Sequence, residues 1–404
     1  MKKVEEIRKD FSVLNQADAK QSVVYFDSAC MSLKPDCVID AIDEYYRKYP
    51  ACAGRSAHKN SSIVTKKVKE ARKNVADFIN AKSENEILFT RNTTEGINLL
   101  ANSFDFKKGD VVLLSDKEHN SNLIPWLYLR DKIGIEVRIC ESKEDNTFDL
   151  DKFSELVKGV KLVSIVHTSN LDGVTNPVKE IIKIAHKAGA LVCLDASQSA
   201  AHEEIDVRDL DVDFLSFSGH KVFGPTGTGI FYGKLNLLEK LNAFIVGGDT
   251  VEFSTYDSYK FLPVPDRFEA GLQDYAGIIG LIEALKYAKK EIGFKYIKQH
   301  ELELNTYISE ELAKYPEIKI IGPKDSALRG SIVNFYIENT DMHKFANMLD
   351  GMANIAIRAG QHCVHSWFNA KKIRNSARIS FSIFNTKEEA ELLVENIKKI
   401  MQII

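Results

Sequence analysis

The chain has 404 residues, of which 44% are hydrophobic and 27% are charged. That composition is typical of a globular protein, and the length suffices for one large domain and one smaller one. The formal net charge of -3 does not favour nucleic acid or an acidic membrane surface as a partner. Because the N-terminus lacks the apolar core of a secretion signal and no apolar run is long enough to span a bilayer, we expect a cytoplasmic protein.

One amphipathic helix and a series of short apolar strands are predicted in the first part of the chain. Residues 61–80 place apolar side chains on a single helical face. Helical stretches separate the strands, and this alternation predicts a mostly parallel sheet with helices on both faces. The predicted strands are the apolar runs at 86–90, 110–115, 161–168, 190–195 and 213–218.

The pattern changes near Gly293, where shorter strands alternate with amphipathic helices in the manner of an α+β unit. Strands are predicted at 331–338, 354–358 and 377–384, followed by a terminal helix at 387–403.

Three parts of the chain are therefore predicted. Residues 22–292 form a large domain that carries the parallel sheet. Residues 293–404 form a smaller C-terminal domain, and residues 1–21 form an arm that packs on this smaller domain.

Polar residues follow several of the predicted strands, at the edge where open parallel sheets bind ligands. Thr93 and Thr94 come after the run at 86–90 and begin a helix, where hydroxyls and backbone N–H groups can hold a phosphate. Asp195 closes the run at 190–195, and a carboxylate in that position needs a partner. Taken separately, each feature is more often explained by a helix N-cap.

A lysine follows the run at 213–218, in the segment SGHKVFGPTGTGIFYG. Lys221 lies just past the strand end, and the glycines after it let the backbone turn tightly. Phosphate donors, a carboxylate and an amine at neighbouring strand ends suit pyridoxal phosphate. The lysine can bind its aldehyde, the carboxylate its ring nitrogen and the hydroxyls its phosphate. The sequence therefore predicts pyridoxal phosphate as the cofactor.

The chain resembles the class V, fold-type-I pyridoxal-phosphate enzymes, and among them the group II cysteine desulfurases that supply sulfur for iron–sulfur clusters. The resemblance implies a large domain whose mostly parallel sheet is sandwiched by helices, a small α+β C-terminal domain, and a homodimer. It extends over nearly the whole chain and is carried by YFDSAC (25–30), TRNTTEGINLLANSF (90–104), EHNSNLIPW (118–126), HTSNLDGVTNP (167–177), DASQSAAH (195–202), SGHKVFGPTGTGIFYG (218–233), RFEAG (267–271), RAGQHC (358–363) and ARISFSIFNT (377–386).

The resemblance also implies a role for each motif residue. Lys221 binds the cofactor, Asp195 pairs with the ring nitrogen and Gln198 bonds the ring hydroxyl. His119 stacks on the ring and moves protons, although by itself it is equally a turn or capping residue. The remaining implied roles are phosphate binding by Thr93, Thr94, Ser218 and His220, binding of both cofactor and substrate by Asn170, and binding of the substrate by Arg358 and Arg378.

Cys363 decides which reaction the resemblance implies. The residues before it match the loop that carries the nucleophile in the desulfurases, whereas a lone cysteine is more often structural. A thiol with a pKa of about 8.5 is only partly ionised at neutral pH, so we expect a cation beside it, either Arg358 or a protonated His362. Cys363 and His365 are too few ligands for a metal site, and no metal is predicted.

The predicted function is conversion of L-cysteine to L-alanine. Sulfur is left on Cys363 as a persulfide and is passed to an acceptor protein or a cluster scaffold. A selenocysteine lyase, an aminotransferase or a lyase acting on another amino acid is the alternative, and in the latter two Cys363 would be incidental. A scaffold without activity is disfavoured because Lys221, Asp195, Gln198 and His119 are all retained.

Several segments depart from the family pattern, and they cluster around the predicted substrate pocket and dimer interface. Leu272 stands after RFEAG, where a threonine usually reaches the phosphate of the neighbouring subunit. Leucine cannot donate a hydrogen bond, so either Gln273 or a backbone N–H substitutes, or the contact is missing. The other departures are Gly54 in place of a usual histidine, Cys30, Cys52, and the aromatic segment VHSWF at 364–368.

Overall fold

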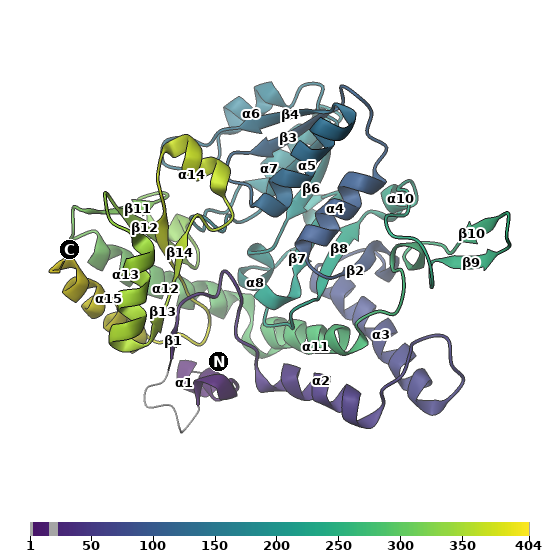
Figure 1. Cartoon of the computed structure of the whole chain (residues 1–404), viewed down its shortest axis with the longest axis horizontal. Coiled ribbons are helices and arrows are strands. Elements are labelled where there is room, and N and C mark those ends of the chain that lie inside the picture. Colours follow the sequence, from purple (N-terminus) through teal and green to yellow (C-terminus); the bar gives the residue numbers. More distant parts are fainter. Residues whose placement is uncertain (1–2, 16–22, 404) are drawn as a thin grey trace.

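The computed structural model describes residues 3–15 and 23–403. Two main sheets organise this part of the chain, a seven-stranded sheet and a four-stranded sheet that lies beside the C-terminal helices (Figure 1). The α/β architecture predicted from the sequence is confirmed. Among the described residues, no helix is both long and apolar enough to cross a membrane.

The large sheet is mostly parallel, as predicted. β8 runs antiparallel to both of its neighbours, and the other adjacent strands are parallel. Side chains are buried along the whole of the central strands, because helices cover both faces. From edge to edge the order is β2 (Ile87–Thr90), β8 (Gly229–Gly233), β7 (Phe214–Ser218), β6 (Leu191–Asp195), β5 (Leu162–Val166), β3 (Val111–Ser115) and β4 (Glu136–Cys140).

Alternate residues of these strands enter two different cores. Val111 and Leu113 pack into one hydrophobic cluster, and Val112 and Leu114 pack into another on the opposite face. The first face is covered by α3 (Lys59–Phe78), α6 (Leu150–Leu156), α7 (Val178–Lys187), α8 (Ser199–His202), α9 (Val207–Leu210) and α11 (Tyr275–Lys286). The second is covered by α4 (Thr93–Ser103), α5 (Asn120–Ile133) and α10 (Leu235–Leu238).

The smaller sheet is antiparallel throughout. Its register pairs Arg358 directly with Arg378 on adjacent strands. The strand predicted at 377–384 ends earlier, because Asn385 Oδ1 accepts a hydrogen bond from the Ser382 backbone N–H (2.9 Å) and closes a turn. The strand order is β11 (Ile318–Ile321), β12 (Ile332–Ile337), β15 (Ser376–Ser380) and β14 (Arg358–Gly360). The sheet forms a separate hydrophobic core with α12 (Phe294–Leu312), α13 (Met342–Ala353) and α15 (Lys387–Met401).

The segment YFDSAC joins this smaller sheet although it lies near the start of the chain. β1 (Val24–Tyr25) pairs in parallel with β13 (Ile355–Ala356), and Asp27 forms a bridge with Ser380. Residues from both ends of the chain therefore meet beside β15.

The N-terminal arm contacts residues of both predicted domains. From α1 (Val4–Arg8), Arg8 Nη1 lies 2.7 Å from Glu389 Oε1. The Phe11 ring packs against Phe384 and Phe223. Residues 1–2 and 16–22 of the arm lie outside the described residues. The division of the chain at residue 293 stays a prediction.

The remaining elements lie at the periphery. α2 (Asp36–Lys48) packs against α11, and α14 (His365–Lys371) follows the loop that contains Cys363. The hairpin of β9 (Val251–Ser254) and β10 (Tyr259–Phe261) projects away from the body of the molecule (Figure 1).

Candidate active site

A cavity of about 270 Å³ opens at the carboxyl ends of β2, β5, β6 and β7. Its volume is near the lower end of the range of about 300–1,000 Å³ for small-molecule sites. All twelve predicted site residues line it: Thr93, Thr94, His119, Asn170, Asp195, Gln198, Ser218, His220, Lys221, Arg358, Cys363 and Arg378.

One end of the cavity is a cluster of hydroxyls at the start of α4. Thr93 Oγ1 lies 2.9 Å from Ser218 Oγ and 2.8 Å from Ser197 Oγ. The Thr93 backbone N–H also donates to Ser218 Oγ (2.9 Å). A Cβ at Gly229 would lie 2.6 Å from Asn92 Cα, so β8 admits this loop because it carries no side chain there. Hydroxyls at a helix N-terminus are suited to a phosphate.

Two further predicted phosphate contacts flank this cluster. Thr94 is exposed, and its Oγ1 lies 2.7 Å from Ser121 Oγ. His220 lies in the 3-10 turn Gly219–Lys221 that follows β7. Burial, together with Lys221 and Lys34, lowers the pKa of His220 to about 4. His220 is therefore neutral at physiological pH and can act as a hydrogen-bonding group.

Asp195 and Gln198 are buried at the end of β6. Asp195 Oδ1 accepts hydrogen bonds from the Ser197 backbone N–H (2.9 Å) and hydroxyl (2.5 Å). Gln198 Nε2 donates to the Ala29 carbonyl (2.9 Å). Because Oδ1 takes both bonds from Ser197, Oδ2 of the same carboxylate can accept from a protonated nitrogen in the cavity.

Lys221 lines the cavity together with Asp195 and Arg378. Burial lowers the pKa of its amine, Arg378 lowers it further, and Asp195 opposes both effects. A lowered pKa increases the fraction of free amine, the form that can act as a nucleophile or base.

His119 caps α5 and lies on the same wall. Its Nδ1 accepts from the Ser121 backbone N–H (3.0 Å), and burial followed by the charge of Lys221 lowers its pKa to about 3. The preceding residue, Glu118, ties the ends of two strands together, since it accepts hydrogen bonds from Ser115 and from Val166 N. His119 is thus a neutral ring on a rigid support.

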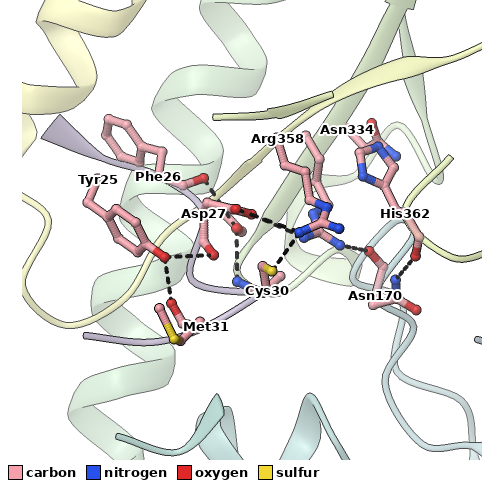
Figure 2. A network of polar contacts seen from close by, with 12 residues as sticks. Tyr25, Phe26, Asp27, Cys30, Met31, Asn170, Asn334, Arg358 and His362 are labelled. Carbon is pink, nitrogen blue, oxygen red and sulfur yellow. Dashed lines mark hydrogen bonds and ion pairs between the residues drawn. The ribbon is translucent and has the colours of Figure 1, made fainter. Parts of the chain in front are cut away.

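The opposite wall is built around Arg378. This buried residue donates from Nη1 to the Asn170 carbonyl (2.9 Å) and from Nη2 to Asp27 Oδ1 (3.3 Å). Asn170 in turn donates from Nδ2 to the His362 carbonyl (2.8 Å; Figure 2). Arg378 Nε and Asn170 Oδ1 are buried and have no hydrogen-bond partner among the described residues. Unpartnered buried groups are rare, and here they indicate a polar ligand.

Arg358 lies beside Arg378 but does not contact Cys363. Its Nη1 is 2.6 Å from Cys30 Sγ and 3.9 Å from Asp27 Oδ2 (Figure 2). Arg358, one of the two cations expected beside Cys363, therefore bonds to the Cys30 thiol instead. The β14–β15 register causes this, because it directs both guanidiniums towards Asp27.

The loop that carries Cys363 has an unusual backbone. His362 and Cys363 have φ angles of 49° and 59°. This left-handed region is uncommon for residues other than glycine, and such strain concentrates at functional sites. Asn120 at the start of α5 pins the loop, since its backbone N–H donates to the Cys363 carbonyl (2.7 Å) and its Nδ2 lies 2.8 Å from His365 Nδ1.

His362 is neutral, so the expectation that a protonated His362 ionises Cys363 is wrong. The side chain is buried, and its Nε2 lies 2.9 Å from Ser376 Oγ. Burial, Arg378 and Arg358 hold its pKa well below the ordinary value. Two guanidiniums nearby disfavour a further positive charge.

Leu272 and Gln273 do not line this cavity. Leu272 is 68% exposed, and Gln273 Nε2 donates to the carbonyls of Ala270 and Gly271 (3.2 Å each). The Gln273 side chain thus bonds to its own loop in this chain. Whether the neighbouring subunit's phosphate is contacted from this loop stays a prediction.

Ser197, Asp27 and Cys30 are among the cavity residues and supports that were not assigned a role from the sequence. Ser197 lies within the DASQ motif and could have been found as a partner for Asp195. Asp27 and Cys30 lie in the quoted YFDSAC segment, but their partners are more than 300 positions away, at Arg358 and Arg378. No local periodicity signals such contacts.

A mostly parallel sheet with a lysine and a carboxylate at neighbouring strand ends, faced by arginines from a smaller antiparallel unit, defines the fold-type-I pyridoxal-phosphate enzymes. Residues 24–393 match the family model of the class V aminotransferases, and the chain belongs to this family.

Known relatives agree with this assignment over the full chain. A probable cysteine desulfurase of Halalkalibacterium halodurans is 39% identical over 399 residues, which are 98% of this chain and 97% of the relative. The apo structure of a cysteine desulfurase from Thermococcus onnurineus NA1 has a TM-score of 0.95 and 36% identity, covering 100% of this chain and 99% of that one. A cysteine desulfurase from Escherichia coli has a TM-score of 0.91, 31% identity and full coverage of both chains. The predicted resemblance to cysteine desulfurases is confirmed.

Proposed function

We propose that the protein is a pyridoxal-phosphate-dependent cysteine desulfurase that converts L-cysteine to L-alanine and transfers the sulfur to Cys363. One observation carries this proposal: Lys221, Asp195 and Cys363 line the same cavity, in a chain whose relatives are named cysteine desulfurases.

The cavity residues fit the cofactor. Thr93 and Ser218 can hold its phosphate, Asp195 can pair with its ring nitrogen, and the amine of Lys221 can bind its aldehyde. His119, which lines the same cavity, could stack on its ring. When bound, pyridoxal phosphate supplies an electron sink that stabilises negative charge on the substrate Cα.

Arg378 and Asn170 are suited to the α-carboxylate of the substrate. Arg378 Nε and Asn170 Oδ1 are two of the buried polar atoms on this wall that lack partners among the described residues, and His362 Nδ1 is a third. The guanidinium can bind a carboxylate with charge-assisted hydrogen bonds, and the amide oxygen can accept from the substrate amine. An amino acid would satisfy both groups at once.

Lys221 and Cys363 carry out the chemical steps. Lys221 Nζ removes the proton from the substrate Cα, and a positioned base of this kind contributes about 10²–10⁴-fold. Cys363 Sγ then attacks the substrate sulfur with its electron pair. The Cβ–S bond breaks, and its electron pair remains on Cβ, which takes up the proton given up by the Cys363 thiol, and Lys221 returns a proton to Cα. One L-cysteine and one thiol thus give one L-alanine and one persulfide, with no external oxidant.

The test is to incubate the holoenzyme with L-cysteine and a reductant and to measure alanine and sulfide together. We expect equal amounts of both, and loss of both with Cys363→Ser. Cys37→Ser removes an exposed thiol outside the cavity and serves as the control. Sulfide formation at the normal rate by Cys363→Ser would disprove the nucleophile, and a keto acid without alanine would indicate an aminotransferase.

We further propose a cytoplasmic homodimer that passes sulfur to an acceptor or cluster-scaffold protein. The six cysteines are free thiols, which fits a reducing compartment. Leu272 is a large exposed apolar side chain where the family usually contacts the neighbouring subunit. Sedimentation of the holoenzyme tests the dimer, and transfer of labelled sulfur to a purified cluster scaffold tests the acceptor.

A further inference from the structure

Two thiols from opposite ends of the chain line the active-site cavity, Cys30 and Cys363. Both are partly buried. Lys221 lines the same cavity, so both thiols border the space in which the amine acts. Cys30 reaches the cavity because the Asp27–Ser380 bridge joins its segment to β15.

A guanidinium contacts the sulfur of Cys30 directly. Arg358 Nη1 lies 2.6 Å from Cys30 Sγ (Figure 2). Arginine has donors and no acceptor, so the sulfur is the acceptor in this contact. A cation beside a thiol favours the thiolate, which is the nucleophilic form.

Two guanidiniums lie beside Asp27 on the wall that holds Cys30. The Asp27 carboxylate lies 3.3 Å from Arg378 and 3.9 Å from Arg358. One carboxylate neutralises one of these two guanidiniums. The second guanidinium, Arg358, contacts the sulfur of Cys30.

Cys30 differs from the other cysteines outside the predicted nucleophile loop. Cys37 is exposed, Cys52 is partly buried, and neither lines the cavity. The wall that holds Cys30 also carries the unpartnered Arg378 Nε and Asn170 Oδ1, which mark it as a ligand-binding wall. Sulfur released from a substrate bound there is therefore delivered into a space lined by two thiols.

We propose that Cys30 is a second sulfur-carrying residue, which accepts the outer sulfur atom of the Cys363 persulfide. The Cys30 thiolate attacks the outer sulfur and forms a new S–S bond. The bond from the outer sulfur to Cys363 Sγ breaks, and its electron pair stays on Cys363 as a thiolate. The outer sulfur keeps its proton. One thiolate and one persulfide stand on each side, so no oxidant or reductant is consumed.

This transfer rests on the proposed desulfurase reaction and has a consequence for its stoichiometry. Once the sulfur has moved to Cys30, Cys363 is again a free thiolate and can attack a second substrate. Without an external acceptor, each chain therefore produces two alanines and stores two sulfur atoms.

The experiment uses the holoenzyme with no added reductant or acceptor and with only a few equivalents of L-cysteine per chain, because a large excess of the free cysteine thiol would itself remove the persulfide sulfur. After the burst, the thiols and persulfides are alkylated, and peptide mass spectrometry locates each added sulfur atom. We expect added sulfur on Cys363 and Cys30, none on the exposed Cys37, and two alanines per chain. Cys30→Ser is expected to halve the alanine burst, and Cys30→Ala repeats this test with a different side chain. Cys363→Ser should leave Cys30 unlabelled.

The outcomes separate this proposal from the desulfurase assignment. Sulfur on Cys363 alone, with one alanine per chain in the wild type, overturns the transfer and leaves the desulfurase reaction standing. Equal labelling of Cys30 and Cys37 shows exchange with free sulfide and also overturns it. Labelling of Cys30 in Cys363→Ser disproves the order of transfer. Absence of both alanine and sulfur on Cys363 in the wild type contradicts the desulfurase assignment itself.

Discussion

The two walls of the cavity are built in different ways. The cofactor wall comes from strand ends of one sheet, and its polar side chains bond to one another, as Thr93 does to Ser197 and Ser218. The substrate wall joins separate segments of the chain, has a strained backbone at Cys363, and leaves buried polar atoms without partners. Its members are Asp27, Cys30, Asn170, Arg358, His362, Cys363 and Arg378.

The difference suggests that the two walls are organised at different times. Strand ends in a continuous sheet are rigid, so the cofactor wall is in position before any ligand binds. Asn170 Oδ1 and Arg378 Nε have no hydrogen-bond partner among the described residues, and a bound substrate would supply partners for both. Substitutions in the two walls should therefore affect different measurements.

Lys221→Ala should have the largest effect, because Lys221 is the proposed base for the substrate Cα. We expect the rate of alanine formation to fall by at least about 10²–10⁴-fold. Lys234→Ala is the matched control: Lys234 follows β8 at the opposite end of the β7–β8 pair, where it bonds Asp211 (2.7 Å) and Asp213 (2.9 Å). Equal losses in steady-state assays of the two variants would contradict a specific role for Lys221.

Arg378→Lys tests the substrate wall. Lysine lacks the planar fork that lets one side chain reach Asn170, Asp27 and a carboxylate together. We expect a loss of about 1.5–3 kcal/mol, or about 10–100-fold in kcat/KM for L-cysteine, carried mainly by KM. Arg374→Lys changes an exposed arginine nearby and should leave both constants unaltered. A drop in kcat with KM unchanged would argue against carboxylate binding by Arg378.

The cofactor wall could be predicted from the residues alone to a large extent. Apolar runs at 190–195 and 213–218 predicted neighbouring parallel strands, and such strands bring their carboxyl ends to one edge. Asp195 and Lys221 therefore had to lie close together. The side-chain bonds within the wall, such as Ser197 to Asp195, depend on turn geometry that the pattern does not specify.

The substrate wall could not be predicted from local pattern. Arg358 pairs with Arg378 through an antiparallel register, and Asp27 joins them through a bridge from the start of the chain. Resemblance to a family predicted the two arginines for the site, and both line the cavity. It did not predict that Arg358 would contact Cys30. When a residue type departs from the family pattern, as Cys30 does, its contacts cannot be predicted from that pattern.

His362→Asn tests whether the substrate wall holds a neutral imidazole. Its pKa is lowered on folding, so the unfolded chain takes up a proton below pH 6.5 while the folded protein does not. Stability from this group is present above pH 6.5 and is lost as the pH falls. Between pH 7 and pH 5 one such histidine costs about 2 kcal/mol of unfolding free energy.

The His362→Asn variant should therefore lose less stability on acidification than the wild type, as measured by urea unfolding at both pH values. Asparagine tolerates the left-handed backbone at this position, and the comparison is made within each variant. His343→Asn, which changes an exposed histidine in α13, should retain the acid sensitivity of the wild type. Identical pH dependence in the wild type and His362→Asn would show that His362 is protonated in the folded protein.

Ser218→Ala should have the smallest effect and probes the cofactor wall. Ser218 Oγ accepts from the Thr93 backbone N–H and lies 2.9 Å from Thr93 Oγ1. Its loss removes one hydroxyl from the proposed phosphate site, at a cost of about 1 kcal/mol, or about fivefold in the affinity of the apo-protein for pyridoxal phosphate. Ser216→Ala removes a buried hydroxyl from the same strand that bonds the Ile230 carbonyl (2.8 Å) and does not line the cavity. Both variants should lose comparable stability, but cofactor titration should show weaker binding for Ser218→Ala alone. Equal affinities in the two variants would mean that the phosphate is held by the backbone of α4 and not by this hydroxyl.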